Sequence, residues 1–232
     1  MYFGLYFWQL TQAQLAMLAT TSVIGGFAGV ALAPIVGRTM GKKWGVIAVF
    51  GSAVLVHVTP VSLRLLGLAP ENGTPELLAL LYGEEIINAT LAAATGVLLF
   101  AILADVVEDA EVKTGRRSEG LLMSAQNLFR KAISGLGIFI ATGVLTFIDF
   151  PEKAERTSVA PEVLRSLGLA YIPTILALYG TAILCLLAYN IGRKRHEENL
   201  AKLDALRRAE ALPVDDAAPP AAEPGAPLPL KP

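Results

Sequence analysis

Polar and basic side chains interrupt an otherwise apolar stretch between residues 119 and 148. Four of them recur at spacings of three and four, which places them on one face of a helix: Ser124, Asn127, Lys131 and Ser134. Gln126 and Arg130 form an adjoining pair, four residues apart. Such side chains bind ions and polar solutes through charge and hydrogen bonds. One side of this helix is therefore predicted to face water or polar partners.

The depth of Lys131 makes its charge informative. If a membrane span begins at Glu119, Lys131 lies ~18 Å into a hydrocarbon core of ~30 Å. An ionised side chain at that depth costs at least ~2.5–3.5 kcal/mol, so we expect it to face a protein interior, a wet cavity or an opposite charge. The alternative is a later span, from which Arg130 and Lys131 snorkel to the interface on their long stems. That span would keep only about seventeen residues, the lower limit for crossing.

The composition of the chain is that of an integral membrane protein. Of its 232 residues, 54% are hydrophobic and 17% are charged, and the mean hydropathy is +0.55. Nineteen basic residues against twenty acidic ones give no positive field for a nucleic-acid partner. Cys185 has no second thiol to pair with. The sequence has no metal-ligand cluster, nucleophile–base set or phosphate-binding loop, so it predicts neither an enzyme nor a bound cofactor.

Five apolar segments are long enough to span a bilayer: 15–37, 44–66, 77–104, 119–148 and 169–192. Residues 1–14 read as the end of a truncated helix followed by a polar hinge. The chain is thus predicted to be an all-α membrane bundle over 15–192, with five complete spans plus a truncated first helix. Polar loops are expected between the spans. Residues 193–212 favour a cytoplasmic helix, and the Pro- and Ala-rich segment 213–232 is expected to be disordered.

The distribution of lysine and arginine predicts the orientation, because cytoplasmic loops are enriched in both. Nine fall on one side of the predicted spans: Arg38, Lys42, Lys43, Lys113, Arg116, Arg117, Arg193, Lys194 and Arg195. Four fall on the other: Arg64, Lys153, Arg156 and Arg165. We therefore expect a multi-pass protein of a bacterial inner membrane, with its carboxy terminus in the cytoplasm.

A longer pattern joins the charged segment 104–119 to the polar helix face. Its members are Ala104, Asp105, Glu108, Glu111, Lys113, Thr114, Gly115, Arg117, Glu119, Gln126 and Lys131. In residue type and spacing it resembles the link between the tenth and eleventh helices of the glycoside-pentoside-hexuronide:cation symporters, a branch of the major facilitator superfamily. The stretch "APIVGRTMGKKW", residues 33 to 44, resembles the superfamily's loop signature between the eighth and ninth helices. The resemblance extends over residues 1 to about 195.

The resemblance implies the carboxy-terminal six-helix half of a major facilitator fold, whose partner is the missing amino-terminal half. It implies a symporter that moves a small polar solute, such as a sugar or glycoside, by alternating access. It places Lys131 in the central cavity, near carboxylates of the other half that bind Na⁺, H⁺ or Li⁺. The neighbouring polar residues would line the same cavity: Ser124, Gln126, Asn127 and Arg130. A cytoplasmic loop would gate the cycle through Asp105, Glu108, Glu111, Lys113, Arg117 and Glu119.

Some residues depart from the family pattern. Gly96 stands where melibiose-type members carry a sugar-stacking tryptophan, which argues against a sugar. Arg130 is an additional charge that could bind an anionic group of the substrate. It could instead pair with Glu84 or Glu85, but these lie ~30 Å along the helix from Asp105, so a rim position is expected for both. His57 reads as a packed histidine, with a proton relay as the alternative.

Two functions of other classes remain open from the residues alone. The chain could be a non-transporting membrane scaffold or a gene remnant, in which the charged helix merely pairs with a partner. A membrane-embedded enzyme is a more distant third possibility. A preceding sequence with six further spans, acidic on the second, would decide for transport.

Overall fold

The structure is a computed structural model, and it describes residues 3–115, 119–151, 159–188, 198–199, 201–203 and 205. Its elements are a short π-helix η1 (Phe3–Phe7) and the helices α1 (Gln12–Met40), α2 (Lys42–Leu65), α3 (Pro75–Thr114), α4 (Glu119–Phe147) and α5 (Pro161–Leu187). All five α-helices are long and apolar enough to cross a membrane. The prediction of an all-α, multi-pass membrane protein is confirmed.

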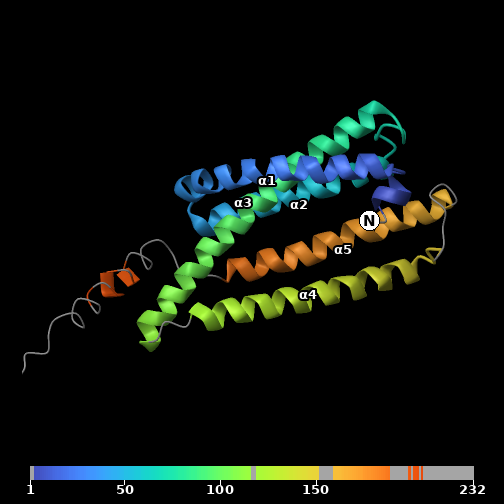
Figure 1. The fold of residues 1–232 in the computed structure, drawn as a ribbon. Coiled ribbons are helices and arrows are strands. Elements are labelled where there is room, and N and C mark those ends of the chain that lie inside the picture. The colour runs from blue at the N-terminus through green and yellow to red at the C-terminus, as the bar shows by residue number, and fades with distance from the viewer. Residues whose placement is uncertain are drawn as a thin grey trace, which may run out of the picture.

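The helices form a packed group and a looser pair (Figure 1). α1 and α2 both pack against α3, and α5 packs against α2. α4 lies beyond α5, on the side away from α1 and α2 (Figure 1), and contacts the rest of the bundle through α5. None of the residues of α4 is buried. One span with a charged centre is thus left uncovered by the described part of the chain.

Small residues let α1 and α3 approach closely. A Cβ atom added at Gly29 would lie 2.2 Å from the carbonyl oxygen of Thr90, and one added at Gly25 would lie 2.4 Å from that of Ile86. The two backbones therefore touch at these positions, as glycine permits in membrane helices. An apolar cluster continues this contact: Ala33, Val46, Val49, Ala94, Leu98 and Ile102.

Local signals set where the helices begin and end. Thr11 and Gln14 form a capping box at the start of α1. Thr74 caps α3, where its side chain accepts a hydrogen bond from the Leu77 amide, and Pro75 follows in the first turn. Gly115 ends α3 in the left-handed conformation, with φ of 64°.

Four of the five α-helices are longer than the apolar segments predicted, and α4 ends one residue earlier than expected. Residues 105 to 114, expected to be a polar loop, form the last turns of α3, so Asp105, Glu108, Glu111 and Lys113 are helical. Acidic and basic residues are acceptable helix formers, and no glycine or proline lies between Asp105 and Thr114. Similarly, Gly41 alone separates α1 from α2, and α5 begins at Pro161. Those loop predictions were wrong because they followed hydropathy alone.

The first segment covers one end of the bundle. After η1, the chain bends at Gln9, with φ of 52°, and enters α1. Phe7, Trp8 and Leu10 are buried against α2 and α3. Asn72, in the turn between α2 and α3, donates to the Phe7 carbonyl at 3.1 Å and accepts from Arg64 at 2.6 Å. Whether residues 1–14 are the end of a longer helix stays a prediction.

Candidate functional site

The last turns of α3 contact the start of α2 through an ion pair. Lys42 Nζ lies 2.5 Å from Asp105 Oδ1, and the Asp105 residue is 3% exposed. Lys42 is the first residue of α2, and 63 positions separate it from Asp105. A buried carboxylate needs such a partner, because an uncompensated charge in the interior is strongly unfavourable. The pair therefore fixes α2 against α3 at this end of the bundle.

A second acidic side chain joins the same region. Asp109 is 7% exposed and lies 2.6 Å from Lys113 Nζ, one turn further along α3. Asn199 Nδ2 donates to Asp109 Oδ1 at 3.1 Å. We call Lys42, Asp105, Asp109, Lys113 and Asn199 the α3-tip charge cluster. It links the end of α3 to the start of α2 and to a residue beyond α5.

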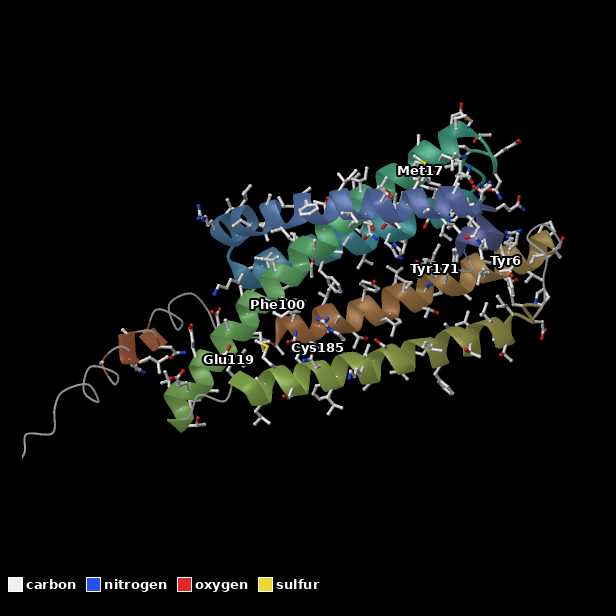
Figure 2. The ribbon with its side chains drawn as sticks, in the orientation of Figure 1. Tyr6, Met17, Phe100, Glu119, Tyr171 and Cys185 are labelled. Atoms are coloured by element: carbon white, nitrogen blue, oxygen red, sulfur yellow. The ribbon has the colours of Figure 1, made fainter. Side chains whose placement is uncertain are left out.

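The other predicted gating residues lie around this cluster. Glu108 and Glu111 are partly buried on α3, whereas Glu119 is exposed at the first residue of α4. Figure 2 shows Glu119 where α4 begins, beside the end of α3. Arg117 lies outside the described residues. The structure thus brings Asp105 and Lys113 into one region, with Glu108 and Glu111 on the same helix.

The predicted cavity residues occupy α4 and lie apart from that cluster. Ser124, Asn127, Lys131 and Ser134, with Gln126 and Arg130 beside them, form what we call the α4 polar stripe. Gln126 is partly buried and the other five are exposed. α4 begins at Glu119, so Lys131 is the thirteenth of its 29 residues, near the middle of the helix. In the described part of the chain, neither Arg130 nor Lys131 has an ion-pair partner.

Sequence reasoning missed three members of the α3-tip charge cluster as site residues. The sequence places Lys42 only among the basic residues that predict the orientation and in the loop signature of residues 33 to 44, and it indicates no role for Asp109 or Asn199. Asp109 and Lys113 carried a usable signal, since opposite charges four apart on a helix attract each other. The contacts of Lys42 and Asn199 join residues far apart in the sequence and had no local signal.

A third polar group lies inside the bundle, where α2, α3 and α5 meet. His57 Nε2 lies 2.5 Å from the Tyr171 hydroxyl, and His57 Nδ1 lies 3.2 Å from Asn88 Nδ2 and 3.5 Å from Glu84 Oε1. The Glu84 side chain is 14% exposed. The rim position expected for Glu84 is therefore wrong, because the side chain faces α2. His57 is not an isolated histidine, although its packing in the bundle agrees with the first interpretation.

Comparison with known proteins identifies the family of this chain. A family model described as MFS/sugar transport protein matches residues 1–193. The chain belongs to this family. The match confirms the resemblance to major facilitator sugar transporters and points to a transporter rather than an enzyme.

Two relatives are similar over most of the chain. YagG of Escherichia coli strain K12, named as a candidate glycoside/cation symporter, is 25% identical over 182 residues, which is 78% of this chain. A protein of Salmonella typhimurium strain LT2, named as a candidate 2,3-dihydroxypropane-1-sulfonate exporter, is 28% identical over 183 residues, or 77% of this chain. The chain spans 36% of the length of each relative. No solved structure matches the chain.

Proposed function

We propose that this chain is the carboxy-terminal six-helix half of a cation-coupled secondary transporter for a small polar solute. Solute and coupling ion would bind at the midplane, between this bundle and a second one that rocks against it. The membrane would be a bacterial inner membrane, with the α3-tip charge cluster on its cytoplasmic side. Both halves are needed, so the chain alone would not transport.

The observation that carries this proposal is the α4 polar stripe. Lys131 and Arg130 lie near the middle of a membrane helix that has no buried residue. Lipid is a poor neighbour for two such charges, because each costs at least ~2.5–3.5 kcal/mol at the bilayer centre. A second helical bundle with carboxylates and a wet cavity would cover the stripe and compensate its charge. Na⁺, H⁺ or Li⁺ bound at those carboxylates would compete with Lys131 for the same negative charge.

The α3-tip charge cluster suits a gate. Its ion pairs lie at the end of the bundle, away from the α4 polar stripe, and Glu108, Glu111, Arg117 and Glu119 would extend it. Such pairs can hold one conformation of a rocking bundle and break in the other. We assign these charges to the conformational step and the α4 stripe to binding.

The substrate class follows from the charges and from the relatives. One relative is named for a glycoside and the other for a sulfonate. Adjacent Arg130 and Lys131 suit a solute with a carboxylate or sulfonate group, because guanidinium and ammonium groups bind such anions strongly. Gly96 offers no aromatic face for a sugar ring. A small hydroxylated anion is therefore the first substrate to test.

The proposal is tested by uptake into proteoliposomes. The chain would be reconstituted alone and together with the amino-terminal half of a related symporter, with sodium or proton gradients imposed. We expect gradient-driven uptake of a hydroxylated sulfonate or a glycoside only when both halves are present. Lys131→Ala should abolish accumulation at a matched protein level, whereas Thr142→Ala, an exposed position on the same helix, should not. Accumulation by the chain alone would contradict the two-half proposal, and full uptake by Lys131→Ala would remove that residue from the mechanism.

A further inference from the structure

Ionisable side chains meet inside the bundle at some distance from both groups described above. His57 lies eight residues before the end of α2, and Glu84 lies nine residues after the start of α3. At ~1.5 Å per residue these positions are ~12 and ~14 Å from the turn that joins the two helices. Both are thus well inside a hydrocarbon core of ~30 Å. Ionisable residues at such a depth are functional-site candidates by default.

Glu84 supplies the second observation. Within the residues that the structure describes, its Oε1 atom is buried and has no hydrogen-bond partner, although it lies only 3.5 Å from His57 Nδ1. A buried acceptor without a donor costs about 1–3 kcal/mol, and more when it is charged. His57 Nδ1 could supply that donor, but it carries a hydrogen only in some tautomers and protonation states of the ring.

The remaining contacts define two arrangements of one proton. In the neutral tautomer with hydrogen on Nε2, Nδ1 accepts from the Asn88 amide at 3.2 Å, and Nε2–H donates to the Tyr171 oxygen. When His57 is protonated, both ring nitrogens are donors, so Nδ1–H turns from Asn88 to Glu84 Oε1 while Nε2–H keeps Tyr171. The proton is taken from water, and Glu84 stays ionised as its counter-charge.

Among the described residues, few charged and titratable groups lie around His57, and Tyr179 of α5, which stacks on Phe50 of α2, is a more distant one. α3 presents Glu84, with Glu85 next to it, and α5 presents Tyr171. On α2 itself, Arg64 lies two turns further on and contacts Asn72. Arg38 is the only charged residue of α1 and lies in its last turn. η1 contributes Tyr6, and its Phe3 ring lies 4.4 Å from that of Tyr171. A carboxylate is thus the dominant charge near His57.

We propose that His57, Glu84, Asn88 and Tyr171 form a proton-binding site that links the protonation of His57 to the packing of α2, α3 and α5. The bound proton adds an ion pair between α2 and α3, while Tyr171 holds α5 to the same imidazole. The His57 side chain is 36% exposed, so the described residues of the bundle do not enclose it fully. This inference goes beyond the proposed transport function and does not depend on it.

The test uses the fact that the chain has two histidines, His57 and His196. His196→Gln leaves His57 as the only one, and ¹⁵N-histidine labelling of the full chain in lipid nanodiscs then reports both ring nitrogens by NMR. We expect His57 to gain a proton between pH 9 and pH 5, from a neutral form with hydrogen on Nε2. Glu84→Gln should lower its proton affinity at least about tenfold, because an opposite charge at this distance favours the charged form. Asn88→Ala removes the hydrogen-bond donor to the neutral ring, and it should therefore raise the proton affinity of His57.

The outcomes separate the proposal from a merely packed histidine. If His57 keeps one charge state from pH 5 to pH 9, the site does not exist, and this result needs no variant at Glu84. If Glu84→Gln folds but leaves the proton affinity unchanged, Glu84 is not the counter-charge and the proposal fails. Glu76→Gln, on the exposed first turn of α3, is the matched control and should have no effect. Transport is not measured, so failure here leaves the proposed function standing.

Discussion

At the scale of single residues, the molecule places charges where they need partners. Asp105 is nearly inaccessible and contacts Lys42, and Glu84 lies against His57. Lys131 and Arg130 have no such contact within the described residues. The contrast separates charges that are paired within this bundle from charges that have no ion-pair partner among the described residues.

The Lys42–Asp105 pair gives a prediction at this scale. Lys42→Met should lower the free energy of unfolding by about 1–3 kcal/mol, because it takes a donor away from a buried carboxylate. Asp105→Asn should cost less, since it also removes the buried charge. Chemical unfolding of the chain in detergent micelles measures both, and the double variant gives the coupling energy. A loss below about 0.5 kcal/mol for Lys42→Met would mean that the pair contributes no net stability.

At the scale of elements, the helices depend on packing of different kinds. α1 and α3 touch through their backbones at Gly25 and Gly29, whereas α5 is tied to α2 by the contact of Tyr171 with His57 and by ring stacking of Phe50 with Tyr179. α4 is the helix held least by its neighbours. Among the described helices, α5 is the one with which it makes more than slight contact. The group of α1, α2 and α3 should thus unfold last.

The contact between α1 and α3 can be tested with one glycine pair. Gly29→Ala should destabilise the bundle by about 1–3 kcal/mol, because its Cβ would fall 2.2 Å from the Thr90 oxygen and 2.7 Å from Ala93 Cβ. Gly26→Ala is the matched control, since nothing lies within 4 Å of its Cβ. That change should be neutral or stabilising by up to about 1 kcal/mol through helix propensity. Thermal unfolding in micelles distinguishes the two, and equal effects would argue against the close approach.

At the scale of the whole molecule, the elements form a bundle in which α4 is exposed on one side. α4 exposes apolar residues together with the polar stripe, for example Leu128 at 68% and Phe139 at 76%. Lipid suits the apolar residues but not Lys131 and Arg130. A membrane half-transporter explains both, because one face of α4 would meet lipid and the other a second bundle.

The orientation of the bundle is a prediction at this scale. Cysteines at Glu71, between α2 and α3, and at Thr114, at the end of α3, should label from opposite sides of the membrane. In a Cys185→Ser background, an impermeant maleimide applied to intact cells should reach position 71, and should reach position 114 only after permeabilisation. Cys185→Ser alone serves as the unlabelled control. Reaction of both positions from the same side would refute the topology. Labelling of position 114 in intact cells, and of position 71 only after permeabilisation, would mean that the orientation is the opposite one.

The sequence predicts the spans well and the contacts poorly, for physical reasons. Apolar runs are a local signal, so α4 was predicted from residue 119 to within one residue of its end. The extension of α3 to Thr114 was missed because charged residues are hydrophilic and yet good helix formers. The contacts of His57 reach Asn88 and Tyr171, 31 and 114 positions away, and only tertiary packing brings them together. The role of the α4 polar stripe remains a prediction, because no described residue forms an ion pair with Arg130 or Lys131.

The length of α3 has a mechanical consequence. Its 40 residues make a rod of ~60 Å, about twice the thickness of the hydrocarbon core. Such a rod acts as a lever arm, since a tilt of about 10° around one end displaces the other by ~10 Å over this length. In a two-half transporter of the kind proposed, a spin label at Lys113 would change its distance to a label in the second half, whereas a label at Glu71, close to the other end of α3, would change its distance little. Pulsed electron resonance would thus detect a small tilt of α3 inside the membrane as a larger change in distance at its end outside the membrane.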